Sequence, residues 1–212
     1  MKHITFYFDV ISPYAYLAFE QLPEALQGIS YAVTYKPVLF AGLLKHHGQL
    51  GPAEIASKRE WTYRQVQWLA RDLGIAFQFP ATHPFNPLPL LRLAVACGEN
   101  GLPNRYVAET LFRHVWRTGE DAENAQRLAT LTEFLKPAQT PNSSEVKAML
   151  KTFTESAIEE GVFGVPTFKV DGKLFFGLDA LPMLATYVRK DARFDDAAWD
   201  GVLKIPVGTT RL

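Results

Sequence analysis

The chain has 212 residues, of which 48% are hydrophobic, so it is long enough to bury a sizeable core. Its 22 basic and 22 acidic residues give a formal net charge of zero, which offers no electrostatic basis for binding nucleic acid or a membrane surface. A single cysteine, Cys97, excludes an intramolecular disulfide and any Cys-x-x-Cys centre, and no apolar run reaches transmembrane length.

The first predicted element is a strand over residues 3–10, HITFYFDV. This segment lacks the apolar run and cleavage site of a signal peptide, so we expect a cytoplasmic protein. A helical pattern follows over residues 13–27, directly after Ser12 and Pro13, which are favoured residues at the N-cap and the first helical position. A second strand over residues 31–40, YAVTYKPVLF, completes an order typical of a βαβ unit in an α/β sheet.

The middle of the chain, residues 41–155, changes character. It contains helical patterns and several proline breaks but no convincing strand. The helical patterns cover residues 52–74, 86–101, 102–119 and 124–136. We therefore expect a large, entirely helical segment here.

Strands return near the C-terminus. Residues 164–177, GVPTFKVDGKLFFG, read as two short strands joined at Asp171-Gly172, which is a strong hairpin signal, and residues 178–190 read as a helix. The end of the chain contains Pro206 and Gly208, which favour an extended segment packed on the body or a loose end.

These elements predict an α/β protein with one small mixed sheet built from both chain ends. We expect a discontinuous domain of residues 1–40 and 156–200, a helical insertion domain of residues 41–155, and a C-terminal tail of residues 201–212.

Two local features suggest chemistry, and each has a plain structural alternative. Ser12 is either only a helix cap, or a hydroxyl that acts with the unpaired N–H groups of the helix terminus to stabilise an anion such as a thiolate. Pro166, in GVFGVPTF, is either an ordinary proline at a strand start or a cis-proline. A cis bond would turn the Val165 backbone N–H and C=O outward, free to pair with an extended ligand.

Together the motifs resemble a known family. The segments FYFDVISPYAYLA (6–18), GVFGVPTF (161–168) and FFGLDAL (175–181) carry the resemblance, which spans roughly residues 4 to 190. The chain resembles the thioredoxin superfamily in its DsbA-like form, and more closely the family of kappa-class glutathione transferases and 2-hydroxychromene-2-carboxylate isomerases. The resemblance implies a thioredoxin-like mixed sheet with a large all-helical insertion. Ser12 and Ala15 stand where dithiol members carry cysteines, so dithiol chemistry is excluded there.

The resemblance also implies glutathione as the cofactor. Ser12 would be the catalytic residue, donating its hydroxyl hydrogen bond to the glutathione sulfur. Asp179 would accept the γ-glutamyl ammonium group, and Lys58 would reach the glycine carboxylate. The full set of implied glutathione-binding residues is Ser12, Lys58, Val165, Pro166, Leu178, Asp179 and Ala180.

At the second-substrate pocket the resemblance implies Lys45, Gln49 and Asn86. Three positions depart from the family pattern. Gln49 replaces an Asn, Leu178 replaces a polar residue, and Ala180 replaces an Arg.

The expected function is that of a glutathione-dependent isomerase or transferase, in which a Ser-stabilised thiolate attacks an electrophilic small molecule. The alternative is a redox-inactive thioredoxin-fold protein that binds extended peptides. A disulfide oxidoreductase is excluded by the cysteine count, and a homodimer is consistent with the resemblance.

The remaining polar candidates receive structural interpretations. His46-His47 lacks a third ligand at a supporting spacing, so we expect no metal site. His3, His83 and His114 are interpreted as structural or exposed, and Cys97 as a small packed hydrophobe. Asp9, three residues before Ser12, is either a satisfied loop residue or a group that tunes the site, and both interpretations stay open.

Overall fold

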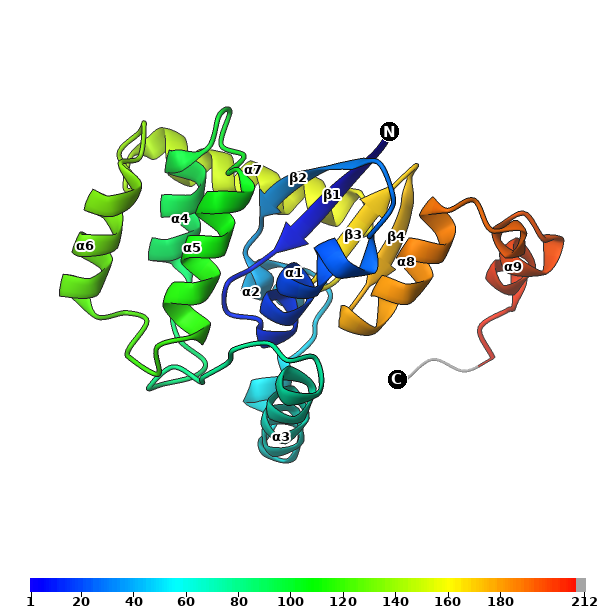
Figure 1. Cartoon of the computed structure of the whole chain (residues 1–212), viewed down its shortest axis with the longest axis horizontal. Coiled ribbons are helices and arrows are strands. Elements are labelled where there is room, and N and C mark those ends of the chain that lie inside the picture. Colours follow the sequence, from blue (N-terminus) through cyan, green and yellow to red (C-terminus); the bar gives the residue numbers. More distant parts are fainter. Residues whose placement is uncertain (209–212) are drawn as a thin grey trace.

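The computed structural model describes residues 1–208. It contains one four-stranded sheet with the order β2-β1-β3-β4 (Figure 1). The strands are β1 (Lys2–Phe8), β2 (Tyr31–Pro37), β3 (Thr167–Val170) and β4 (Lys173–Phe176). β1 pairs in parallel with β2, whereas β1 with β3 and β3 with β4 are antiparallel pairs. The prediction of one mixed sheet built from both chain ends is therefore confirmed.

The β3–β4 hairpin turns where the sequence predicts it. Asp171 and Gly172 have φ angles of +48° and +78°. Two consecutive positive φ angles are the requirement of a type I′ turn, which Asp-Gly meets at low cost.

Side chains of β1 alternate between two layers of helices, as the period of a strand requires. Phe6 and Phe8 enter the main core with helices α1 (Pro13–Ala25) and α8 (Leu181–Val188), and the Phe6 ring stacks on Phe168 of β3 with centroids 4.8 Å apart. Tyr7 points to the opposite face, into a smaller cluster under α7 (Ser144–Glu159).

Helices fill the chain between β2 and β3, as predicted (Figure 1). Besides α7 they are α2 (Phe40–His46), α3 (Ala56–Asp72), α4 (Leu88–Cys97), α5 (Arg105–Trp116) and α6 (Ala125–Leu135). Because α7 runs through residue 155, where we placed the end of the insertion, the division into domains stays a proposal. In the part of the chain that the structure describes, no helix has both the length and the apolar character needed to cross a bilayer.

The second strand is shorter than predicted, because it ends at Pro37 and a helix begins at Phe40. The backbone N–H groups of Leu39 and Phe40 donate to the side chains of Thr154 and Asp9 instead of continuing the ladder. Side-chain acceptors from distant elements thus start α2, a helix that the local sequence pattern did not reveal.

The C-terminal segment forms short helical turns up to residue 204, which differs from the extended or loose end that we expected. The turns are η3 (Ala192–Phe194), α9 (Ala197–Gly201) and η4 (Val202–Lys204). The Phe194 ring packs edge-on against Tyr187 of α8, with centroids 5.1 Å apart. Residues 209–212 of the predicted tail lie outside the described residues.

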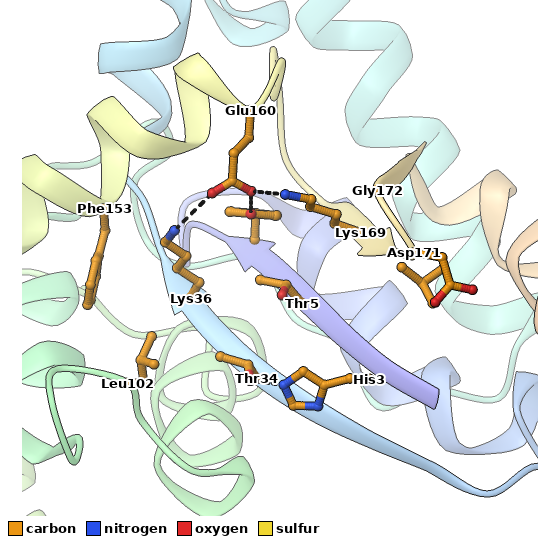
Figure 2. Close-up of a pocket in the computed structure, with 12 residues that line it drawn as sticks. His3, Thr5, Thr34, Lys36, Leu102, Phe153, Glu160, Lys169, Asp171 and Gly172 are labelled. Atoms are coloured by element: carbon orange, nitrogen blue, oxygen red, sulfur yellow. Dashed lines mark hydrogen bonds and ion pairs between the residues drawn. The ribbon is translucent and has the colours of Figure 1, made fainter. Parts of the chain in front are cut away.

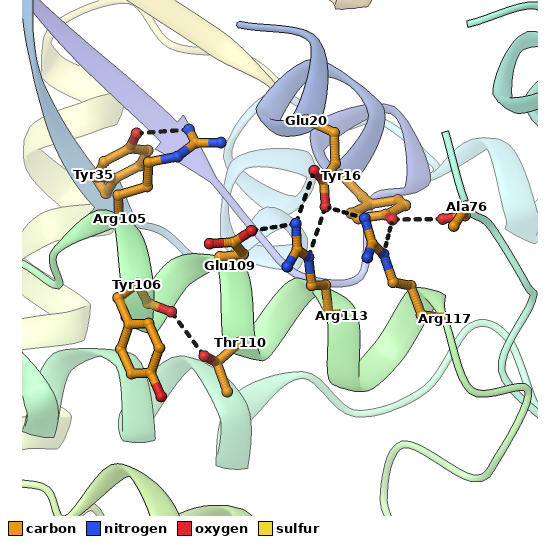
Figure 3. A network of polar contacts seen from close by, with 10 residues as sticks. All are labelled: Tyr16, Glu20, Tyr35, Ala76, Arg105, Tyr106, Glu109, Thr110, Arg113 and Arg117. Atoms are coloured by element: carbon orange, nitrogen blue, oxygen red, sulfur yellow. Dashed lines mark hydrogen bonds and ion pairs between the residues drawn. The ribbon is translucent and has the colours of Figure 1, made fainter. Parts of the chain in front are cut away.

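A polar network anchors α1, the helix that begins next to Ser12, to α5 (Figure 3). The Glu20 carboxylate accepts hydrogen bonds from Arg113 at 3.1 Å and Arg117 at 3.0 Å. The Tyr16 hydroxyl donates to the Ala76 carbonyl at 2.6 Å and accepts from Arg117. These contacts restrain the position of α1 against the helical segment.

A second network fixes the end of α7 on the sheet (Figure 2). The Glu160 carboxylate lies 2.6 Å from the Lys169 ammonium of β3 and 3.6 Å from that of Lys36 of β2, and it accepts a hydrogen bond from Tyr7 of β1. Partial burial acts to raise the pKa of Glu160, but these partners outweigh it and the pKa is lowered. One carboxylate therefore holds three strands to the chain segment that leads to β3.

We predict that Glu160→Gln lowers the free energy of unfolding by about 2 kcal/mol, because it removes the anion that compensates two ammonium groups. The matched control is Glu155→Gln, since among residues 1–208 Glu155 forms an ion pair only with Lys151, at 3.6 Å, and its side chain is 56% exposed. That control should stay within about 0.5 kcal/mol of wild type in urea titrations. Equal effects of the two variants would show that the Glu160 cluster does not anchor α7.

Candidate active site

Ser12 is the N-cap of α1, in the turn that follows β1. Its Oγ accepts the backbone N–H of Ala15 at 3.2 Å, its own N–H donates to the Asp9 carbonyl at 3.1 Å, and Pro13 occupies the first helical position. The prediction of an N-cap is confirmed. The residue is 8% exposed, so the hydroxyl lies at the helix terminus with little competing water.

The two motifs of the sequence meet at this point. The Val165-Pro166 peptide bond is cis, and the Ser12 hydroxyl donates to the Val165 carbonyl at 3.3 Å. We expected both backbone groups of Val165 to face outward, and the carbonyl instead accepts from Ser12. Within residues 1–208 the Val165 N–H has no hydrogen-bond acceptor, so it is an open donor beside the serine.

Ser12 and Val165 lie in the wall of a cavity of about 420 Å³. Most of the lining is apolar, contributed by α2, the α1 start, the 3-10 turn η1 (Pro52–Glu54), the segment before α4, and β4. The polar residues of the lining are Asp9, Ser12, Tyr14, Glu54, Thr62 and His83. A pocket with mainly apolar walls and a few convergent polar groups is the usual form of a small-molecule site.

The residues implied for the second substrate lie outside this lining. Lys45 and Gln49 are exposed at and beyond the end of α2. Asn86 is exposed as well, and its Oδ1 accepts the Leu88 N–H at 3.1 Å. The Asn86 side chain therefore supports the start of α4, while neighbouring Pro87 contributes to the cavity.

The residues implied for the two ends of glutathione lie at the surface near the cavity. Lys58 is exposed in the first turn of α3, four residues before Thr62, and residues four apart share a helix face. Asp179 is exposed in the turn after β4, and its carboxylate contributes, after burial, to a raised pKa of Tyr14. Leu178 is half-buried and Ala180 is buried in the main core.

Asp9 belongs to the cavity wall and is completely buried. Its Oδ1 accepts the Ile11 N–H at 3.1 Å and its Oδ2 accepts the Phe40 N–H at 2.9 Å. Burial raises the pKa of Asp9 to about 7, although both hydrogen bonds act to lower it. A carboxyl that titrates near neutral pH beside Ser12 favours the interpretation that Asp9 tunes the site.

His83 also lines the cavity, a position that the sequence did not predict. Its Nε2 is 2.9 Å from the Ile11 carbonyl, which can only accept, so Nε2 carries the proton and Nδ1 accepts from the Tyr63 hydroxyl at 2.7 Å. Burial lowers the pKa of His83, so the ring is neutral at pH 7. The ring thus supports the turn before Ser12. No histidine pattern in the sequence indicates this, because the contact depends on the loop before α4.

Cys97 is half-buried against the main core, and burial raises the pKa of its thiol to about 11. The thiol is therefore neutral at pH 7, and it lies in α4 rather than in the cavity lining. Among residues 1–208, no group of three or more His, Cys, Asp or Glu side chains is arranged to hold a metal ion.

The raised pKa of Asp9 predicts a specific pH dependence of stability. Its pKa is about 7 in the folded chain and 3.8 ordinarily, so its neutral form stabilises the fold fully below pH 4, and that contribution is lost as pH rises to 7. The free energy of unfolding of wild type, relative to Asp9→Asn, should fall by about 4 kcal/mol between pH 4 and pH 8. Denaturant titrations of both proteins across this range measure the difference. A difference that is constant or grows with pH would contradict the assignment.

Comparisons with known proteins agree with this geometry. A family model described as a DSBA-like thioredoxin domain matches residues 3–189. The chain is 28% identical over 206 residues to glutathione S-transferase kappa 2 of Caenorhabditis elegans, covering 88% of this chain and 92% of that one. It is 26% identical over 200 residues to the 2-hydroxychromene-2-carboxylate isomerase of Sphingobium xenophagum, covering 88% and 98%. A solved structure of a 2-hydroxychromene-2-carboxylate isomerase superimposes with a TM-score of 0.75 at 24% identity, covering 91% of this chain and 97% of that one. The chain belongs to the family of DsbA-like thioredoxin-domain proteins.

Proposed function

We propose that this protein is a glutathione-dependent enzyme that joins the glutathione sulfur to a neutral electrophilic small molecule. The observation that carries the proposal is the contact between the Ser12 hydroxyl at the start of α1 and the Val165 carbonyl before cis-Pro166, at the edge of an apolar cavity. The names of the relatives, glutathione transferases and isomerases, support the same class of chemistry.

The residues at this place fit glutathione, which is an extended, peptide-like thiol. The open Val165 N–H and the adjacent carbonyl offer a backbone donor and acceptor of the kind that pairs with an extended peptide unit. Asp179 supplies an exposed carboxylate for the ammonium end, and Lys58 supplies an exposed ammonium for a terminal carboxylate. Bound glutathione would supply a thiolate nucleophile, the reactive form of a thiol.

Ser12 would favour that thiolate in two ways. Its hydroxyl can turn from the Val165 carbonyl to donate to sulfur, and the N-terminus of α1 places further N–H groups at the same point. Lowering a thiol pKa by about 1.5 units corresponds to roughly 2 kcal/mol of preference for the thiolate. Hydrogen bonds and a helix terminus together can supply this amount.

The charge of the cavity bears on the choice between transferase and isomerase. Among the described lining residues there is no Lys or Arg, while Asp9 and Glu54 contribute carboxyl groups. Glu54 is already engaged with the Gly51 N–H. A second substrate that carries a carboxylate would therefore find no cation in the lining and would lie near the carboxyl groups of Asp9 and Glu54, which disfavours its binding. Neutral electrophiles, and with them the transferase, are favoured over isomerisation of a chromene carboxylate.

A protein that binds extended peptides would use the same backbone groups of Val165, but it would not need an apolar cavity next to them. The apolar pocket between α2 and the segment before α4 favours a small molecule. We also propose that the protein forms a homodimer and lies in the cytoplasm.

Ser12 variants separate capping from thiolate stabilisation. Ser12→Ala should cost about 1 kcal/mol of stability, and Ser12→Gly only a few tenths, because glycine is a fair N-cap. Both variants lack the hydroxyl, so both should raise the pKa of enzyme-bound glutathione by about one unit. Ultraviolet thiolate absorbance against pH measures the pKa, and calorimetry measures glutathione affinity. Equal thiol pKa values in all three proteins would leave Ser12 as a cap only, and absence of glutathione binding in wild type would favour the peptide-binding alternative.

A matched pair of electrophiles tests the charge of the second substrate. We predict that kcat/KM for cinnamaldehyde exceeds that for 4-carboxycinnamaldehyde by about tenfold or more, after division by the ratio of their uncatalysed rates with glutathione. Ala53→Lys places a cation in the lining and should lower the ratio of the two kcat/KM values. Glu155→Lys adds a cation outside this cavity and should leave that ratio unchanged. A wild-type preference for the carboxylate would contradict the neutral-substrate proposal.

A further inference from the structure

Helix α2 forms one wall of the cavity, and side chains of other elements hold its first turn. Phe40, Ala41 and Leu44 of α2 line the cavity. The N-cap residue of α2 is Leu39, whose side chain cannot cap, so the first N–H groups depend on outside acceptors. Thr154 of α7 accepts the Leu39 N–H at 3.0 Å, and Asp9 accepts the Phe40 N–H at 2.9 Å.

The Asp9 carboxyl also bonds to the turn that precedes Ser12. Its other oxygen accepts the N–H of Ile11, the residue directly before Ser12. A single carboxyl therefore bridges the Ser12 turn and the first turn of α2. Both of these structures line the cavity.

This carboxyl has no countercharge. Within residues 1–208, no Lys, Arg or His nitrogen lies within ion-pair distance of Asp9, which is completely buried. Burial raises its pKa, and only the two backbone hydrogen bonds oppose the rise. The titratable groups on the surrounding elements, none of which contributes to this shift, are Tyr7 and Glu160 on its face of the sheet, Tyr14 of α1, Lys45 of α2, Glu54 of η1 and His83.

We propose that Asp9 is a positioning residue that acts as a proton-dependent latch, holding α2 against the Ser12 turn while the carboxyl carries a proton and releasing it on ionisation. A buried carboxylate without a countercharge is costly, and its two backbone hydrogen bonds offset only part of that cost. Contact with water would relieve the rest. Ionisation therefore favours a state in which the first turn of α2 has moved away and water reaches Asp9. The first turn of α2 therefore stays against the Ser12 turn at lower pH and moves away from it at higher pH.

The connection of the latch to catalysis rests on the proposed function. A glutathione thiolate at Ser12 would place a second negative charge near Asp9, and like charges disfavour each other's ionisation. The thiolate would therefore raise the pKa of Asp9 and keep the latch closed to higher pH. By thermodynamic reciprocity, the closed latch would favour the thiolate to the same extent.

Hydrogen exchange of the ligand-free protein tests the latch itself. After correction for intrinsic exchange, protection of the amides of Leu39 and Phe40 should fall about tenfold from pH 6 to pH 8. This factor follows from a pKa of about 7 in the closed state and the ordinary aspartate value in the open state. Protection of α5 amides that exchange through global unfolding should fall by the same factor, because ionisation of Asp9 also lowers the free energy of unfolding, but these amides should stay better protected than Leu39 and Phe40 at every pH. Equal protection of the two sets would show that exchange at the start of α2 follows global unfolding, and it would overturn the latch.

Two variants separate the proton from the hydrogen bond. Asp9→Asn should show no pH dependence of protection in α2 over this range, because nothing titrates there. Thr154→Val removes the other side-chain acceptor at the α2 start, so protection should be lower at every pH while the tenfold fall persists. The proposal is overturned if protection in wild type is flat with pH, or if the fall survives in Asp9→Asn.

Carbon-13 titration of the wild-type Asp9 carboxyl makes the test independent of whether Asp9→Asn folds. The pH at which the fall in protection levels off must coincide with the midpoint of the carboxyl titration, and a clear separation refutes the latch. Adding glutathione should then move both of these pH values upward. If neither moves, the result counts against the proposed function, while the latch in the free protein still stands.

Discussion

The pairing of β1 with β3 is the constraint on which the candidate site depends. Tyr7 lies opposite Thr167, so the residues just beyond each strand, Ser12 and Val165, come within hydrogen-bond distance across a separation of 153 residues. The aromatic stack of Phe6 on Phe168 and the Glu160 cluster stabilise this pairing from the two faces of the sheet. The long helical segment between the strands is free to form the remaining walls of the cavity, because its ends are held by the sheet.

Much of this arrangement could be predicted from the sequence, since local signals are strong at the chain ends. Ser-Pro at a helix start, Asp-Gly between two short strands and a proline before a strand each determine local backbone geometry. The roles of Asp9 and His83 could not be predicted in this way. Asp9 depends on the N–H of Phe40, and His83 on the carbonyl of Ile11, and both contacts join segments whose spacing in the sequence carries no periodic signal. Helix α2 was missed for the same reason.

The electrostatic character of the site follows from what surrounds Ser12. A helix terminus and an open backbone N–H favour an anion beside Ser12, where we propose that the glutathione sulfur binds. The rest of the cavity is mainly apolar and lacks a lining cation among the described residues. The site thus separates one place for negative charge from a larger place for neutral surface. Asp9 lines the same cavity, and burial raises its pKa to about 7, which disfavours a second anion beside the first.

The most direct test of the central claim is a crystal structure of the protein with glutathione bound. We expect the glutathione sulfur within hydrogen-bond distance of Ser12 Oγ, the cysteinyl unit paired with the backbone of Val165, and the ammonium end near Asp179. Glutathione bound elsewhere, or bound with its sulfur turned away from Ser12, would contradict the claim that this serine and the Val165 backbone form a thiolate site.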